Sequence, residues 1–506
     1  MKYYLSNLLI KPTDTQTMIK AKVAAALRIP ERSFRFSILS KASELRPGGC
    51  VIRANIAVET NEFVRDTSVV FFNERPKLEI PNIGPKVIGI IGAGIAGLLA
   101  AKVVLDAGGK PIVFDKGKDL PEREMARDVY EKNGIFDPKN NIRLGFGGHA
   151  IYTGGYLKLD HSPESIYFQE DLAARLNDKA ILTEEIAYLP ASKIKKYMML
   201  LKEEILSKGG EFRFNSEVTK IKSLFNRLKG IDYSEGKNNR SIKLDALIYC
   251  GSDDYPAFLQ KHLREKLPVS WAVGVVVENR QRKVETAYFG SNAKAYPPFI
   301  EAGSFPSKNG FDVHFVSPLN SCTIFPFGVE ENSVSIMPGV VDRKINENAC
   351  MPIVVLPKDG SKLVNNPLTE IARSSFKNSM PYACPSESLS DFLLRKEPYH
   401  YRVIKPTCPR GFYLGDLNSF LPGPVADALH YGIATLRKRY PFFLEDDSAI
   451  SGFILRPVVD VPKDFGGLPS PMKGFYALTG DGLFPQEISA SARKGVAIAA
   501  SCVQDI

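Results

Sequence analysis

The sequence predicts an α/β fold with a parallel β-sheet at its centre, and three observations lead to this prediction. Residues 87–115 alternate a buried apolar strand, a glycine turn, a helix and a second strand, which is the order of a βαβ unit. Residues 474–506 return to the order of strand, glycine turn and helix. The 506 residues, 44% hydrophobic and 24% charged, have the composition of an ordinary globular protein with room for two or three domains.

Residues 1–84 are predicted to form a small N-terminal α+β domain. Its helix is expected to begin at a Thr-Asp-Thr capping sequence, and its strands are apolar or alternating runs. Residues 73–85 contain three prolines and one glycine and are the predicted linker. The predicted elements are strand 3–10, helix 13–27 and strands 34–40 and 51–59.

The rest of the chain is predicted to form a cofactor-binding domain with a second domain inserted into it. Residues 85–264 and 446–506 supply the two parts of the first domain. Residues 265–445 are richer in proline and in strand-like segments, and they form the predicted cap or substrate domain. Beyond the first βαβ unit, the predicted elements of the first domain are helix 193–208 and strands 211–214, 218–224 and 244–249.

The first glycine turn carries the pattern Gly92-x-Gly94-x-x-Gly97 where a strand meets a helix. The first glycine permits a tight turn, the second lets the backbone approach a pyrophosphate, and the third lets the helix pack close to the strand. The positive N-terminus of that helix faces the phosphate charge. Asp115 ends the next strand about 20 residues on, where a ribose-hydroxyl acceptor is expected. The predicted contacts of this Rossmann-like dinucleotide site are Gly92, Gly94, Ile95, Ala96, Gly97 and Asp115.

A second motif, near the C-terminus, indicates which dinucleotide binds. Gly480-Asp481-Gly482 follows an apolar strand at 475–478 and precedes a small-residue helix that starts at 488–492. In flavoproteins with two dinucleotide-binding folds, a late Gly-Asp binds the ribityl chain, and the next helix N-terminus stabilises the anionic reduced flavin. A nicotinamide enzyme has no use for this motif, so the sequence predicts FAD; a plain turn with a solvated aspartate is the alternative. The predicted contacts are Gly480, Asp481, Ile488 and Ser489.

Further motifs lie on both sides of the fingerprint. They are the runs 33–41, 51–59, 114–117 with Arg123, 141–148, 155–157, 245–251 and 271–275, the residues Arg343, Asn348 and Arg456, and the run 480–482. In this order they resemble the FAD-utilising dehydrogenases that carry a small N-terminal domain, and the likeness extends over nearly the whole chain.

The resemblance implies a glutathione-reductase-type FAD domain with an inserted α+β cap. The chain departs from the family at Phe146, Gly154 and Tyr156, where the family usually has Glu, Asp and Lys, and at 323–328 and 483–487. These changes indicate a divergent member with a more apolar pocket, and they leave the substrate and the reaction direction open. The further cofactor contacts that the resemblance implies are Lys116, Arg123, Gly147, Gly148, Val218 and Gly251.

The flavin itself exchanges hydride at N5, and three residues are candidates for a catalytic or binding role beside it. His149 follows the loop glycines and is the candidate general base or flavin contact, with a structural histidine as the alternative. Arg456 is the candidate anchor for an acidic substrate or for flavin O2, against an interdomain salt bridge. Tyr152 is the candidate proton donor or pocket wall, against a packing role.

Composition argues against other classes of site. The seven cysteines include no CxxC pair, which disfavours a disulfide framework, a zinc site or a dithiol centre and favours a reducing cytoplasm. The histidines are isolated, so no metal is expected. The net charge of +10 is scattered, which disfavours nucleic acid as a partner, and the apolar run 87–105 is interrupted by glycines and Lys102, which disfavours a membrane span.

The predicted function is an FAD-dependent oxidoreductase that acts on a small organic substrate by hydride transfer at flavin N5. Because no second GxGxxG follows a strand, electrons are expected from a transiently bound NAD(P)H, from a protein donor or from the substrate. The alternatives are a flavin-dependent RNA-modifying protein, a prenyl-lipid reductase at a membrane surface, and a flavin-binding partner without catalysis. The oligomeric state is left open.

Overall fold

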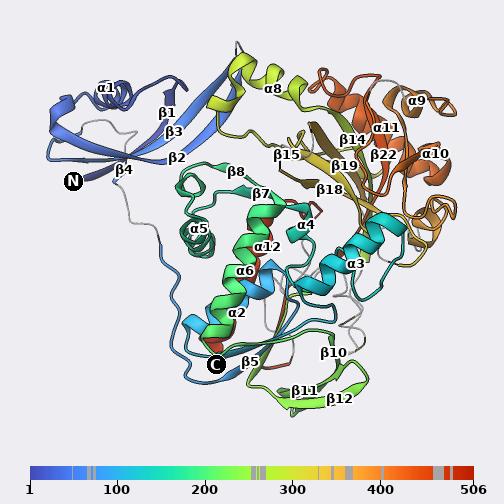
Figure 1. Ribbon diagram of the computed structural model, residues 1–506. Helices are drawn as coiled ribbons and strands as arrows, with labels where there is room; N and C mark the ends of the chain where they lie inside the picture. Colours follow the sequence, from blue (N-terminus) through green and yellow to red (C-terminus); the bar gives the residue numbers. More distant parts are fainter. Residues whose placement is uncertain are drawn as a thin grey trace.

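The protein consists of a small N-terminal sheet, a central parallel sheet with helices, and a large mixed sheet (Figure 1). The computed structural model describes residues 1–47, 49–64, 70–71, 76–251, 258, 261, 269–328, 330–342, 347–358, 368–400, 404–459, 472–478 and 483–506.

The central sheet confirms the predicted α/β fold. Its order is β23-β13-β5-β6-β9, and every neighbouring pair is parallel. In chain order this is 5-4-1-2-3, so the strand order reverses on either side of the first strand, as in doubly wound dinucleotide-binding sheets. The strands are β5 (Val87–Ile91), β6 (Lys110–Phe114), β9 (Glu211–Arg213), β13 (Ala246–Tyr249) and β23 (Phe475–Ala477).

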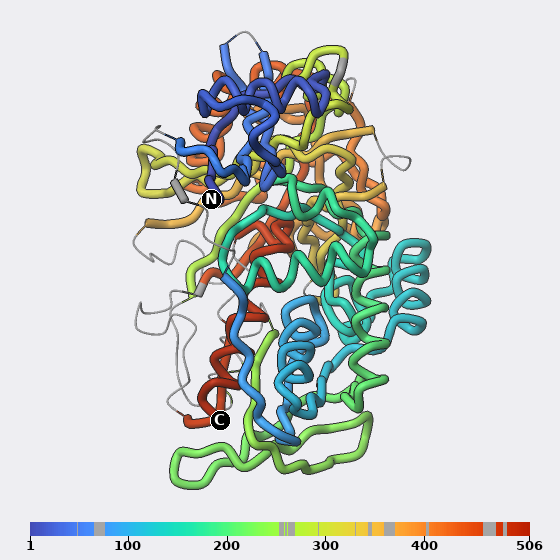
Figure 2. The backbone as a smooth tube through the Cα atoms, turned by 90° about the vertical axis from the view of Figure 1, so that its left-hand side faces the viewer, coloured from blue at the N-terminus to red at the C-terminus, as the bar shows by residue number. Residues whose placement is uncertain are grey.

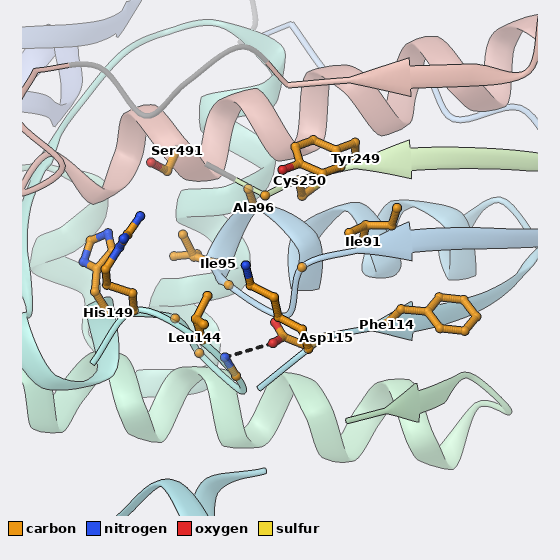
Figure 3. A pocket seen from close by; sticks show the side chains of 18 of the residues that line it. Ile91, Ile95, Ala96, Phe114, Asp115, Leu144, His149, Tyr249, Cys250 and Ser491 are labelled. Atoms are coloured by element: carbon orange, nitrogen blue, oxygen red, sulfur yellow. Dashed lines mark hydrogen bonds between the residues drawn. The ribbon is translucent and has the colours of Figure 1, made fainter. Parts of the chain in front are cut away.

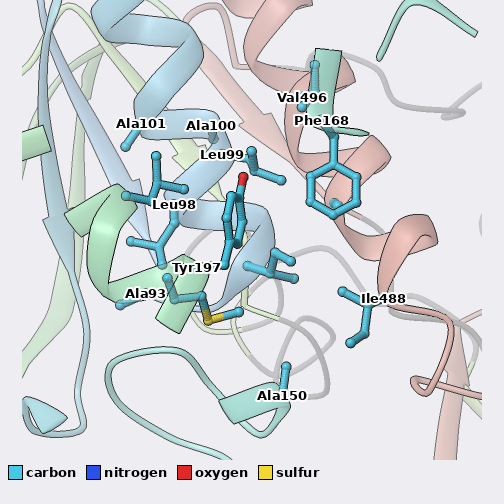
Figure 4. Close-up of a cluster of buried hydrophobic side chains, with 14 of the residues drawn as sticks. Ala93, Leu98, Leu99, Ala100, Ala101, Ala150, Phe168, Tyr197, Ile488 and Val496 are labelled. Atoms are coloured by element: carbon cyan, nitrogen blue, oxygen red, sulfur yellow. The ribbon is translucent and has the colours of Figure 1, made fainter. Parts of the chain in front are cut away.

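Two helices from distant parts of the chain pack together beside this sheet. α2 (Ile95–Asp106) lies against α12 (Ile488–Asp505), and a Cβ at Gly495 would come within 2.3 Å of the Ala96 carbonyl oxygen. This contact therefore requires glycine at 495. Tyr197 and Phe168, from α6 (Ala191–Ser207) and α5 (Pro163–Leu176), extend the same apolar core (Figure 4).

A sheet replaces the usual helix between β9 and β13. This connection is the antiparallel sheet of β10 (Ser216–Leu224), β11 (Arg227–Glu235) and β12 (Asn238–Lys243). Ile221 and Ile231 pack in one apolar cluster with Phe475 of β23. The lysine and arginine side chains of the sheet are exposed or half-buried, so it forms an outer layer beside the central strands.

The large sheet has the order β15-β16-β19-β14-β22-β20-β21 and packs against α8 (Gln281–Phe289) and α11 (Gly423–Arg437). β22 pairs with β14 from Val269↔Val459 to Glu278↔Ala449, so the predicted boundary at 446 does not follow the sheets. Pairing with a strand about 180 residues earlier in the chain holds β22 there. The strands are β14 (Val269–Arg280), β15 (Ala302–Pro306), β16 (Phe311–Val316), β19 (Asn348–Pro357), β20 (Cys384–Ser388), β21 (Phe412–Leu414) and β22 (Ala449–Val459).

The N-terminal domain has the predicted strands and helix, with sheet order β2-β3-β1-β4. It attaches to the loop before β8 (Ile186–Leu189): Glu185 accepts hydrogen bonds from Ser40 at 3.0 Å and Arg53 at 2.6 Å, and Lys41 N–H donates to Thr183. The elements are β1 (Lys2–Ile10), α1 (Gln16–Leu27), β2 (Phe34–Arg46), β3 (Gly49–Thr60) and β4 (Val70–Phe71). The described part of the chain contains no helix that is both long and apolar enough to cross a membrane.

Candidate functional site

A pocket of about 400 Å³ lies at the carboxyl ends of β5, β6 and β13, beside the N-terminus of α2. In doubly wound sheets, ligands bind where the strand order reverses, and the pocket is at that point. Figure 3 shows side chains from these strands, from the loop before α4 (Ala150–Thr153) and from α12 around it. The predicted residues that line it are Gly92, Gly94, Ile95, Ala96, Asp115, Lys116, Gly147, Gly148, His149, Val218, Gly251 and Ile488.

The three fingerprint glycines occupy three different environments. Gly92 has φ 104°, a conformation that other residues rarely adopt. A Cβ at Gly97 would lie 1.9 Å from the Gly92 carbonyl oxygen, so the helix can approach the strand only with glycine there. A Cβ at Gly94 would have no atom within 4 Å. Gly94 therefore faces the open pocket, and the space in front of its backbone is available to a ligand.

Asp115 joins three segments around the pocket. Its Oδ2 accepts the Ala93 N–H at 2.8 Å, and its Oδ1 accepts the N–H groups of Gly117 at 2.8 Å and Gly145 at 2.9 Å. The bond from Gly145 is the dashed line in Figure 3. A carboxylate has about four lone-pair sites, so one remains for a ligand hydroxyl. The carboxylate thus holds the fingerprint turn and the 141–148 loop while it lines the pocket.

The 141–148 loop forms the wall opposite the fingerprint. Gly147 N–H donates to the Ala93 carbonyl at 2.7 Å, and a Cβ at Gly148 would lie 3.5 Å from the Gly94 Cα. Two glycine turns therefore meet at the N-terminus of α2.

Arg123 holds this loop from behind and is not among the residues that line the pocket. It comes from α3 (Leu120–Asn133), is 1% exposed, and donates to the carbonyls of Asn141, Ile142, Phe146 and Gly148. Burial lowers the pKa of its guanidinium. Arg123 was predicted to contact the cofactor, but in the structure its guanidinium supports the 141–148 loop instead.

His149 is the candidate catalytic residue that the structure brings to the pocket. Its Nδ1 lies 3.2 Å from Thr153 Oγ1, and its ring meets the edge of Phe327 with centroids 5.8 Å apart. Arg143, which also lines the pocket, lies over the same Phe327 ring at 5.2 Å. One aromatic ring therefore supports two basic side chains at the wall of the pocket.

Tyr152 and Arg456 do not line the pocket. The Tyr152 ring lies between the guanidinium groups of Arg123 and Arg127, each 4.9 Å from its centroid. Its hydroxyl has no hydrogen-bond partner among the described residues, and burial raises the pKa of the phenol. Arg456 is 3% exposed on β22, opposite Ala272 of β14. Both side chains are buried. The sequence did not predict this, because their neighbours come from elements that the sequence pattern does not connect.

The C-terminal segment contributes part of its predicted contacts. Ile488 and Ser491 at the start of α12 line the pocket, whereas Ser489 is fully buried and accepts the Lys158 N–H at 3.0 Å. Gly480 and Asp481 lie outside the described residues, as does Arg343 of the family motif.

Several lining residues were not predicted. Arg143 lies in the glycine-rich run 141–148, and Ser491 lies at the helix start 488–492. These two motifs were the sequence signals that could have identified them as lining residues. Glu217 and Lys261, paired at 3.5 Å, have no comparable motif. The lining residues that sequence reasoning missed are Ile91, Phe114, Arg143, Leu144, Gly145, Ala150, Ser216, Glu217, Tyr249, Cys250, Phe258, Lys261, Pro485 and Ser491.

The described residues include no group of three or more His, Cys, Asp or Glu side chains that could hold a metal ion.

No protein-family model matches the chain. An uncharacterized protein of Clostridium beijerinckii is 21% identical over 490 residues, which cover 90% of each chain. Among solved structures, a flavoprotein/dehydrogenase from Cytophaga hutchinsonii is similar with a TM-score of 0.37 and 13% identity, covering 83% of this chain and 78% of that one. CtdE in complex with FAD has a TM-score of 0.35 and 13% identity over 83% and 84% of the two chains. A triple mutant of the flavin-dependent brominase Bmp2 has a TM-score of 0.36 and 12% identity over 82% and 79%.

Proposed function

We propose that the pocket binds FAD and that the protein is an FAD-dependent oxidoreductase acting on a small organic substrate. The observation that carries this proposal is the meeting of two glycine turns at the N-terminus of α2, beside the carboxylate of Asp115, where the strand order reverses. A helix N-terminus with exposed backbone N–H groups is suited to a pyrophosphate.

The residues present fit FAD. The open space before Gly94 would take the pyrophosphate, and the remaining lone pair of Asp115 Oδ2 would accept a ribose hydroxyl. Val218 and the Glu217–Lys261 pair would border the adenine end. Ile488 and Ser491, at the positive end of α12, would face the flavin. The β10–β12 sheet between β9 and β13 supports a glutathione-reductase-type arrangement.

The chain's own residues would position the reactants and handle protons. When bound, FAD supplies hydride exchange at N5. His149, held by Thr153 and Phe327, would give or take the accompanying proton at its imidazole ring. Arg143, on the same ring, would bind negative charge on the cofactor or substrate.

The family and the compartment belong to the same proposal. The motifs are those of a divergent FAD-utilising dehydrogenase with a small N-terminal domain. The seven cysteines, all of them described, form no disulfide bond, which supports a reducing cytoplasm.

Purification without added flavin tests the proposal. We expect a yellow protein with absorption maxima at roughly 370 and 450 nm that releases FAD, and no FMN, on heating. Anaerobic addition of NADH, NADPH or candidate substrates should bleach the longer-wavelength band for one of them. A folded but colourless protein that fails to take up added FAD would refute the proposal.

A further inference from the structure

The sheet of β10, β11 and β12 lies at the end of the molecule away from α8 and α11 (Figures 1 and 2). Phe225 and Asn226 form the two-residue turn that joins β10 to β11, since Leu224 pairs with Arg227. The Phe225 side chain is 95% exposed and Leu224 is 55% exposed. The tip of this hairpin therefore presents two large apolar side chains to solvent.

The backbone of the turn is unfavourable for phenylalanine. Phe225 has φ 50° and Asn226 has φ 56°, the left-handed conformation that favours glycine or asparagine. The other turn of this sheet, between β11 and β12, has Gly236 at φ 60°. Folding alone thus favours glycine at position 225 as well. A strained, exposed aromatic residue at this place points to a role at the surface.

The strands behind the tip carry an excess of positive charge. Residues 216–243 contain seven basic and three acidic residues. The three acidic side chains are all paired: Glu217–Lys261 at 3.5 Å, Asp232–Lys222 at 2.6 Å and Glu235–Arg240 at 2.5 Å. Asp245, just beyond β12, accepts the Val87 N–H at 2.8 Å. The exposed basic residues near the tip with no acidic partner among the described residues are Arg227, Lys229, Lys243 and Lys473, the last joined to Arg227 by a β-bridge.

We propose that this hairpin tip docks on the anionic face of a lipid bilayer. Phe225 and Leu224 enter the interfacial region, while the basic residues behind them contact negatively charged headgroups. The charge is complementary to such a surface, and a bilayer buries both apolar side chains. A nucleic acid matches the charge equally well, but a base can stack only on the aromatic ring, so Leu224 favours lipid.

The docking tip and the pocket occupy the two ends of one strand. Val218 lines the pocket and lies six residues before Leu224 on β10, a separation of roughly 20 Å at about 3.3 Å per residue. Docking therefore holds the protein at the surface without covering the pocket. The inference goes beyond the proposed function and does not depend on the cofactor.

Flotation with lipid vesicles tests the tip. The full chain should float with phosphatidylcholine vesicles that contain phosphatidylglycerol, stay behind with phosphatidylcholine alone, and be released by high salt. Phe225→Gly should weaken binding about tenfold or more, because it removes the inserted ring. Its thermal unfolding should be unchanged or shifted upward, since glycine suits φ 50°. The matched control is Tyr399→Gly, which removes an 88% exposed aromatic residue elsewhere and should float as the unmodified chain does.

Single charge variants test the headgroup contacts. Lys229→Gln and Lys243→Gln should each weaken flotation about fivefold, and Lys396→Gln, an exposed lysine outside the sheet, should have no effect. The proposal is overturned if the chain does not float with phosphatidylglycerol vesicles, or if Phe225→Gly floats equally well. Retention of RNA without vesicle binding, unaffected by Phe225→Gly, would also overturn it and assign the charge to nucleic acid.

Discussion

Asp115 follows β6 of the parallel sheet, and Glu387 lies on β20 of the large sheet. Both are buried carboxyl groups, but they differ in the number of backbone N–H groups that they accept. Asp115 accepts three N–H groups from glycine turns. Glu387 accepts one, from Leu417 at 2.7 Å, and its Oε2 has no partner among the described residues. Burial raises the pKa of Glu387 to about 8.

Glu278 on β14 is a second buried carboxyl group of the large sheet. Burial raises its pKa to about 7, although Thr407 and Asn348 donate hydrogen bonds to it. Asp115 lies where glycine turns at the carboxyl ends of the parallel strands supply backbone donors, whereas burial favours the neutral form of both glutamates inside the large sheet.

The largest expected effect concerns the open glycine of the pocket. Gly94→Val places a branched side chain where the backbone must meet the pyrophosphate, and FAD affinity should fall by about two orders of magnitude or more. Thermal unfolding of the apoprotein should be unchanged, because a Cβ at Gly94 touches nothing. Gly423→Val is the matched control, since that glycine has equally open space and lies outside the pocket. Equal FAD affinity in the two variants would contradict the assignment of the pocket.

Asp115→Asn removes the charge that holds three N–H groups. Each hydrogen bond to a charged group contributes about 1.5–3 kcal/mol, so FAD affinity should fall roughly 10- to 150-fold. The free energy of unfolding in urea should also fall, by about 2 kcal/mol, because the 141–148 loop loses an anchor at Gly145. FAD titration and urea unfolding measure the two effects. An unchanged affinity would show that the carboxylate only supports the loop.

Glu387→Gln should flatten the dependence of stability on pH. Because the folded protein binds the proton of Glu387 more tightly than the unfolded chain does, its contribution is full below about pH 4.5 and is lost as pH rises through about 8. Each pKa unit corresponds to about 1.4 kcal/mol, so the unmodified chain should lose up to a few kcal/mol over this range. Urea unfolding at several pH values should show a smaller loss for the variant. Glu397→Gln, at an exposed position, should keep the full dependence.

Tyr152→Phe should have the smallest effect. The hydroxyl is buried without a hydrogen-bond partner among the described residues, so its removal should change the free energy of unfolding by less than about 1 kcal/mol. The ring would remain between Arg123 and Arg127. Rapid-mixing measurement of flavin reduction should give the same rate as before. A tenfold slower reduction would show that the Tyr152 hydroxyl takes part in the reaction.

The sequence predicted the pocket unevenly, and the reason is physical. Of the predicted contacts and candidates, 12 line the pocket, and four of them, Gly92, Gly94, Ile95 and Ala96, lie within one turn. Arg123 was predicted as a cofactor contact from its place in a motif, yet its four carbonyl partners lie 18 to 25 residues away. A motif records that a residue is needed near a site, and the folded loop decides what its side chain touches.

The sequence by itself determined the elements whose requirements are local. Strand, glycine turn and helix at 87–115 follow from apolar periodicity and from backbone conformations that only glycine adopts easily, and both are written within a few residues. The tertiary structure decided which distant segments meet: β22 with β14, Glu217 with Lys261, and Gly495 with Ala96. Those contacts depend on packing between elements far apart in the chain, where many sequences satisfy the same pattern and only the assembled core selects one arrangement.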